Sequence, residues 1–142
     1  MSSSAEILQP VMALLSWTAL MWAWMYATRI PAISKLGLKM DGNVPSSELM
    51  NQLPPAVRWK ADNYNHLLEQ PTLFYAIALS LAVIDVGSGA NLLLAWAYVG
   101  LRVVHSLVQV LGNKIMLRFG LFVVASLVLY TLLIRAVLLV FA

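Results

Sequence analysis

Cysteine is absent from the 142 residues of this chain. The protein therefore forms no disulfide, and the chain supplies neither a thiolate nucleophile nor a thiolate metal ligand. Its two histidines, His66 and His105, stand alone on separate predicted helices, so the sequence predicts no metal site. A glycine-rich phosphate loop and a serine-hydrolase elbow are also missing. Whatever chemistry the protein supports depends on arginine, carboxylate, imidazole and amide groups.

Charged residues are scarce as well. They make up 11% of the chain, whereas 61% of the residues are hydrophobic; soluble domains have roughly 25% and about 45–50%. A chain this short cannot hide so much apolar surface in a core of its own. Lipid is therefore the expected solvent, and the net charge of +3 is too dispersed to indicate nucleic-acid binding.

Four apolar segments predict four membrane-spanning helices. The first covers about 22 residues, or roughly 33 Å of helix, which matches a bilayer core of about 30 Å. The second is longer, and Pro71 should kink it near its middle. The predicted fold is an all-α four-helix membrane bundle, a single domain over residues 1–142. The expected spans are residues 7–28, 55–86, 90–111 and 116–140.

The connections between these spans differ in length. Residues 29–53 contain prolines, glycines and charges, which predicts a polar loop with a short helix near residues 45–52. Residues 85–89 and 112–114 predict tight turns. The first few residues lack the basic region of a signal peptide, so we expect the first span to be retained.

Basic residues indicate how the chain crosses the bilayer. They concentrate in the first and third connections and at the adjoining ends of the spans, whereas the second connection and the termini outside the spans have none. The positive-inside rule therefore places the first and third connections in the cytoplasm and both termini outside it. The residues concerned are Arg29, Lys35, Lys39, Arg58, Lys60, Lys114 and Arg118.

Two stripes of polar residues enter the apolar sequence. Helical spacing puts each stripe on one helix face: Arg58, Asp62, Asn65, His66 and Glu69 on the second span, and Arg102, His105 and Gln109 on the third. Ionisable groups at membrane depth are costly, so they are functional-site candidates.

The topology brings both stripes to the cytoplasmic half of the bilayer. Arg118 opens the fourth span at the same side. We expect these residues to converge on a polar pocket between helices with excess positive charge. Because arginine presents a planar fork of donors to carboxylates, the pocket suits an anionic ligand from the cytoplasm. Nearby lipid could deliver an apolar second substrate.

Structural roles for the same residues are alternatives. Glu69 and Arg102 could form only an interhelical ion pair, and Arg118 could be a topology charge. His105 could be a hydrogen-bonded packing residue. Asp62 is expected to pair with Arg58 along the helix.

The quoted residues carry a family resemblance. The segment Asn-Tyr-Asn-His-Leu-Leu-Glu69-Gln-Pro71-Thr-Leu-Phe-Tyr, the segment Tyr98-Val-Gly-Leu-Arg102-Val-Val-His105, and Arg118 together resemble the MAPEG family, the membrane-associated proteins in eicosanoid and glutathione metabolism. The resemblance implies a homotrimer that binds glutathione between subunits near the cytoplasmic side. It also implies a glutathione transferase or peroxidase-like activity on a lipophilic small molecule.

The resemblance further assigns individual roles. Glu69 matches the carboxylate that contacts the glutathione amine, and Arg102 matches an arginine that contacts its peptide or carboxylate. Arg118 matches the catalytic arginine that stabilises the glutathione thiolate. The remaining expected glutathione-binding residues are His105, His66, Asn65 and Gln109.

The sequence also departs from the family pattern. His66 stands where an asparagine is usual, Asp62 and Asn65 stand where eukaryotic members have arginines, and Gln109 stands where they have a tyrosine. These departures motivate a second hypothesis, a non-catalytic protein of this fold that binds a lipid head group or another anionic metabolite. A third is a structural subunit of a larger assembly. The short chain resembles a bacterial member, which implies a bacterial inner membrane.

Overall fold

Helices account for all the regular secondary structure in residues 3–142, the part of the chain that the computed structural model describes. The prediction of an all-α protein is therefore confirmed for this range. In chain order, the elements are η1 (Ser3–Ile7), α1 (Leu8–Leu36), α2 (Ser46–Met50), α3 (Pro55–Leu67), α4 (Pro71–Val83), α5 (Ala90–Leu111) and α6 (Ile115–Val140).

Three helical stretches are long and apolar enough to cross a bilayer. They are Ala5–Leu36, which joins η1 to α1, and the helices α5 and α6. The predicted short helix near residues 45–52 is present as α2, and the predicted third and fourth spans match α5 and α6 to within one residue. The protein is thus an integral membrane protein with at least three membrane-spanning candidates.

The second predicted span is not one helix, and the expectation of a kinked helix over residues 55–86 is wrong. The chain forms two helices of 13 residues, α3 and α4, interrupted at residues 68–70. Pro71 has no N–H to donate to the C=O of Leu67, and its ring crowds that carbonyl, so α3 stops there. The same proline suits the first position of α4. Helix α4 then ends at Val83, before the turn at Asp85.

The first helix is longer than predicted. Residues 29–36, expected in the polar loop, continue α1 by about two turns, and Pro31 lies inside the helix. Helix α1 ends where Gly37 adopts a left-handed conformation with φ of 59°. The N–H of Gly37 reaches back to the C=O of Ser34 at 3.1 Å, and the N–H of Leu38 reaches that of Ile33 at 3.3 Å. This glycine-terminated ending satisfies carbonyls that a helix end leaves free.

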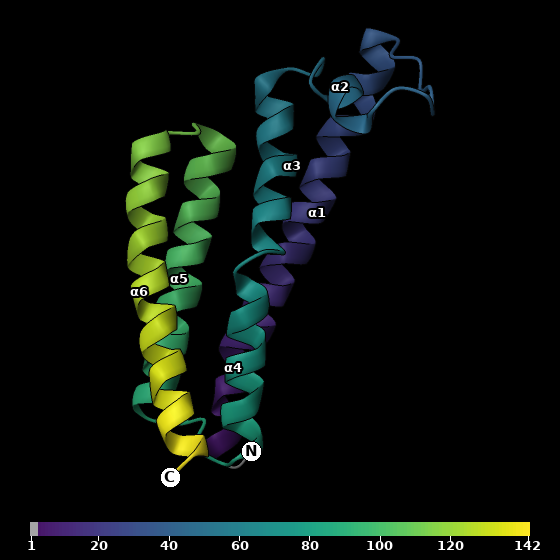
Figure 1. Ribbon diagram of the computed structural model, residues 1–142. Coiled ribbons are helices and arrows are strands. Elements are labelled where there is room, and N and C mark those ends of the chain that lie inside the picture. The colour runs from purple at the N-terminus through teal and green to yellow at the C-terminus, as the bar shows by residue number, and fades with distance from the viewer. Residues whose placement is uncertain (1–2) are drawn as a thin grey trace.

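The helices form two groups that separate toward one end. Figure 1 shows α5 and α6 side by side, and α1 beside α3 and α4, with both termini at the end where the groups converge. The apolar core occupies the convergent part, where Leu14, Phe74, Leu81, Tyr98 and Leu129 are buried. Toward the other end, which carries α2, the two groups diverge. The polar residues of α3 and α5 lie in this diverging half.

An arginine ties the convergent end together. The Nε of Arg135 on α6 donates to the Oδ1 of Asn91 on α5 at 2.8 Å, and the Nδ2 of Asn91 donates to the C=O of Val86 at 2.9 Å. This arginine therefore has a side-chain partner within the chain, whereas the arginine of α5 described next has only a backbone carbonyl.

Candidate functional site

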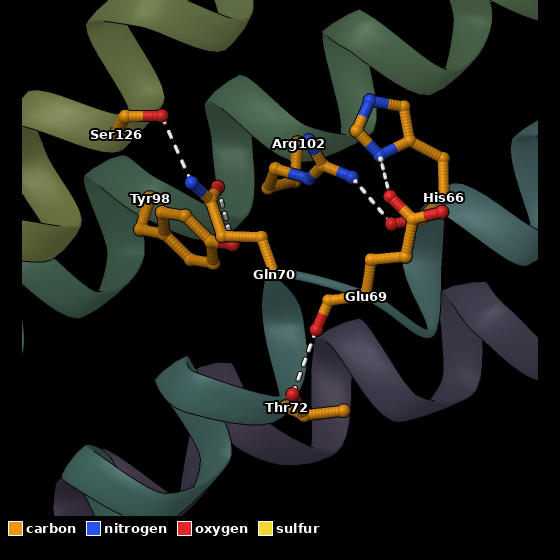
Figure 2. A network of polar contacts seen from close by, with 7 residues as sticks. All are labelled: His66, Glu69, Gln70, Thr72, Tyr98, Arg102 and Ser126. Carbon is orange, nitrogen blue, oxygen red and sulfur yellow. Dashed lines mark hydrogen bonds and ion pairs between the residues drawn. The ribbon is translucent and has the colours of Figure 1, made fainter.

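The interruption between α3 and α4 places a backbone carbonyl against a buried arginine. Because the α3 hydrogen-bond ladder stops at Leu67, the C=O of His66 accepts from the Nη2 of Arg102 at 3.2 Å (Figure 2). Arg102 lies on α5 and is only 1% exposed. The proline-induced break therefore gives this guanidinium its backbone partner.

Arg102 is otherwise unpaired. Its Nε and Nη1 atoms are buried and find no hydrogen-bond partner within residues 3–142. The ion pair found in that range joins His66 to Glu69, so no described carboxylate neutralises Arg102. Burying a charge without a counter-ion is costly in protein and in lipid. The site therefore contains a buried guanidinium with unpaired donors and no described counter-ion.

Two histidines stand beside this arginine. The rings of His66 on α3 and His105 on α5 meet edge to face, with centroids 5.0 Å apart, and Phe122 of α6 lies 5.5 Å from His66. His105 is 1% exposed and its Nδ1 has no described partner. The sequence-based alternative of a hydrogen-bonded packing histidine therefore finds no support at Nδ1.

A cavity of about 210 Å³ opens at this histidine pair. Arg118, at the start of α6, reaches the cavity and donates from its Nη1 to the Oδ1 of Asn113 in the preceding turn. The remaining wall is apolar. The cavity is lined by His66, His105, Ile115, Arg118, Phe119 and Phe122.

Glu69 makes its described ion pair with His66 rather than with Arg102 (Figure 2). Its Oε2 lies 3.5 Å from the Nδ1 of His66, and 70% of its side-chain surface is exposed. Within the described chain it makes no ion pair with Arg102, so the interhelical ion pair that we considered as a structural alternative is absent. The carboxylate is available to a group outside the protomer.

Gln70 joins three helices at the break. Its Oε1 accepts from the hydroxyl of Tyr98 on α5 at 3.2 Å, and its Nε2 donates to the Oγ of Ser126 on α6 at 2.9 Å (Figure 2). Tyr98 is fully buried and stacks on Phe74, with centroids 4.9 Å apart. These contacts fix the position of the chain between Glu69 and Pro71.

The structure brings together only some of the predicted site residues. His66, His105 and Arg118 share the cavity, and Arg102 adjoins them through the carbonyl of His66. Asp62 and Asn65 on α3 are exposed, as is Glu69 in the interruption that follows α3. Gln109 is 2% exposed, and its Oε1 has no partner in the described range. It does not line the cavity.

Sequence analysis missed three polar residues near the site. Asn63 is 1% exposed with neither amide atom paired among the described residues, and Ser106 is fully buried with its Oγ similarly unpaired. Asn63 stands one helical turn before His66, and Ser106 follows His105. Gln70 immediately precedes Pro71. The spacing of Asn63 from His66 along the helix, and the position of Gln70 beside Pro71, were the sequence signals that could have pointed to these two residues.

Comparison with known proteins places the chain in a family. The sequence profile of the MAPEG family matches residues 7–138, nearly the entire chain. Neither the curated proteins nor the solved structures contain a match. The match spans every helix from α1 to α6 except the last two residues of α6. The chain therefore belongs to the MAPEG family of membrane proteins.

Proposed function

We propose that this protein is a membrane-bound, glutathione-dependent transferase or peroxidase-like enzyme that acts on lipophilic electrophiles. The observation that carries the proposal is Arg102, a buried guanidinium with two donor atoms unpaired in the described chain. Glutathione presents two carboxylates and an amine. An arginine fork binds a carboxylate well, and the exposed carboxylate of Glu69 suits the amine.

The outward-facing residues of α3 support a site between subunits. Asp62, Asn65 and Glu69 are exposed, and they lie in the segment for which the sequence predicts a second membrane passage. Polar side chains at this depth are costly against lipid, which favours their being covered by protein or ligand. We therefore propose a homotrimer in which a neighbouring subunit completes the glutathione site, on the side that the positive-inside rule assigns to the cytoplasm.

Arg118 is the proposed catalytic residue. A cationic neighbour favours the thiolate form of a thiol, which is the nucleophile. In the transferase reaction, the sulfur forms a bond to an electrophilic carbon, and the leaving group departs with its bonding electron pair. In the peroxidase reaction, a hydroperoxide is reduced to an alcohol and water while two glutathione molecules are oxidised to their disulfide. The apolar wall of Ile115, Phe119 and Phe122 suits a lipophilic substrate.

Activity of the purified protein tests this mechanism. We expect glutathione conjugation of a lipophilic electrophile, and we expect Arg118→Ala to lower the rate by at least roughly tenfold while glutathione still binds. Binding is measured by calorimetry on the same samples. A rate unchanged by Arg118→Ala would refute the assigned role of Arg118.

A contact within the site favours a second candidate function. Arg118 already donates to Asn113 in its own turn, which is compatible with a structural role. The protein would then be a non-catalytic member of the family that binds an anionic metabolite or head group at Arg102. Absence of glutathione binding at millimolar concentration, with the trimer intact, would favour this candidate. An obligate larger assembly, the structural-subunit hypothesis, requires instead that the purified protein be unstable alone.

A further inference from the structure

A second cationic cavity lies at the end of the molecule that carries α2, away from the histidine pair. Its volume is about 80 Å³, and three helices contribute to it: α1 with Arg29, α2 with Met50 and Asn51, and α3 with Arg58, Ala61 and Asp62. None of these residues lines the cavity at the histidine pair. The cavity is therefore distinct from the one at the histidine pair, although one of its lining residues, Asp62, also belongs to the exposed row near the proposed glutathione site.

Both arginines of this cavity lack partners. The Nε atoms of Arg29 and Arg58 are buried, and neither has a hydrogen-bond acceptor within residues 3–142. Asp62, four residues after Arg58, was expected to pair with it. That expectation is wrong for the described structure, in which neither arginine forms an ion pair. Two guanidinium groups and the carboxylate of Asp62 thus line this space, and no described ion pair joins them.

Aromatic residues place this cavity at the level of the lipid head groups. Lys60, two residues after Arg58 on α3, extends its ammonium over the ring of Trp24, 5.2 Å from the centroid, and donates to the C=O of Ala56 at 2.9 Å. Tyr26 is 40% exposed on the same part of α1. Tryptophan, tyrosine and lysine gather where hydrocarbon meets head groups. Arg29 follows this belt along α1, where phospholipid phosphates are found.

We propose that Arg29 and Arg58 bind the phosphate of an anionic phospholipid, with the acyl chains lying along the apolar surface of α1. The cavity holds several water molecules or one phosphate-sized group, since a single water needs only about 10–15 Å³. Asn51 supplies a further amide donor. The lining keeps a net positive charge, because two arginines outnumber the single carboxylate of Asp62. Exposed Trp22 and Ile30 continue the apolar path on α1. Basic pockets between membrane helices recognise anionic head groups.

Lipid retention tests the proposal directly. The protein is placed in nanodiscs that contain equal amounts of phosphatidylglycerol and phosphatidylcholine. It is then purified from them, and the lipid molecules that remain bound to it are counted by native mass spectrometry. We expect the wild type to retain phosphatidylglycerol preferentially. The double variant Arg29→Gln/Arg58→Gln should lower that preference roughly tenfold or more, given about 1 kcal/mol per basic residue near an anionic surface. The matched control Lys35→Gln/Lys39→Gln removes the same charge from exposed positions and should retain the preference.

Further arms make the result decisive. Equal retention of both lipids by the wild type, or an unchanged preference in Arg29→Gln/Arg58→Gln, would overturn the proposal. If the double variant does not fold, Arg29→Lys/Arg58→Lys keeps the charge and removes the planar forks, and a reduced preference supports the site. Saturable binding of inorganic phosphate without any lipid preference would assign the cavity to a free anion instead. If glutathione displaces the lipid, the two ligands share one site, and the proposal of a separate lipid site is wrong.

Discussion

Arg102 combines deep burial with a nearly empty hydrogen-bonding capacity. Its guanidinium has five N–H donors, yet only Nη2 has a described partner, the carbonyl of His66. Stability alone does not explain this arrangement, since an apolar side chain of similar size would avoid the desolvation cost. A binding role accounts for it because the ligand provides the missing acceptors. On this proposal, the desolvation of the Arg102 guanidinium destabilises the ligand-free protein, and ligand binding offsets that free-energy cost.

Replacing Arg102 by methionine separates these two contributions. We expect Arg102→Met to change the unfolding free energy by no more than about 2 kcal/mol, because the lost hydrogen bond is offset by the removed desolvation cost. Glutathione affinity should fall by at least roughly tenfold, because a buried charge-assisted contact is lost. Thermal unfolding in detergent and calorimetric titration provide the two measurements.

Arg135→Met is the matched control for this substitution. Arg135 also belongs to a membrane helix, but its partner is Asn91 at the convergent end. Its removal leaves Asn91 unpaired, so it should destabilise the fold by about 1–3 kcal/mol without changing glutathione affinity. Wild-type affinity in Arg102→Met would rule out Arg102 as the anion-binding residue.

Helical spacing identified the polar residues but could not establish what their faces meet. His66 lies at the edge of the α3 stripe and turns inward, whereas Asn65 and Glu69, on the same predicted face, turn outward. Their directions depend on how α3 sits against α1 and α5, a tertiary property that the spacing does not contain. Asn63 was passed over because it lies outside that face, although it is buried against the bundle.

At the scale of elements, the break between α3 and α4 is the feature on which the site depends. At the break the carbonyl of His66 accepts from Arg102 as well as from the N–H of Glu69, and Gln70 reaches α5 and α6. Membrane helices tolerate such breaks where side chains repair the lost backbone bonds. Arg102 provides one such repair. The two bonds of Gln70 then hold the start of α4 in position.

A double-mutant cycle measures the coupling at this break. We expect Gln70→Leu and Tyr98→Phe each to lower the unfolding free energy by about 0.5–1.5 kcal/mol. Gln70→Leu removes the acceptor of the Tyr98–Gln70 hydrogen bond, and Tyr98→Phe removes its donor. The double variant should cost less than the sum, since that bond is counted in both single variants. Denaturant unfolding in mixed micelles gives the four values.

Thr131→Val serves as the control in this cycle. The hydroxyl of Thr131 is exposed and bonds only the C=O of Leu127 within α6. It should not couple to Gln70→Leu. Strict additivity between Gln70→Leu and Tyr98→Phe would contradict a shared contact that holds the break.

The three long helices α1, α5 and α6 could be predicted from apolar length, because lipid imposes that length on each span. Helices α5 and α6 accordingly agree with their predicted bounds. Local sequence did not show whether a proline would end a helix or lie inside it. Pro31 is accommodated inside α1, whereas Pro71 ends α3 at a point where Gln70 has bonds to other helices. The difference lies in the tertiary partners, which periodicity cannot reveal.

At the scale of the whole molecule, the diverging helix groups leave α3 with an outward polar row. Asp62, Asn65 and Glu69 form this row, and all three are exposed in the protomer. Glu69 would be costly to present to lipid, because its carboxylate has only His66 as a described partner. The proposed homotrimer would remove that cost, because subunits and glutathione would cover the row.

Replacing Glu69 by leucine distinguishes a covered row from one that faces lipid. A carboxylate facing the bilayer costs about 2.5–3.5 kcal/mol near its centre, so Glu69→Leu would stabilise a protomer whose row meets lipid. In the proposed trimer, we expect no gain in thermal stability and a loss of glutathione binding, since the carboxylate then serves the ligand. Ser80→Leu is the control, because Ser80 is exposed on α4 and makes a bond only within its own helix. Native mass spectrometry should give three times the 15.7 kDa of one chain; a 15.7 kDa species, together with stabilisation by Glu69→Leu, would contradict the trimer.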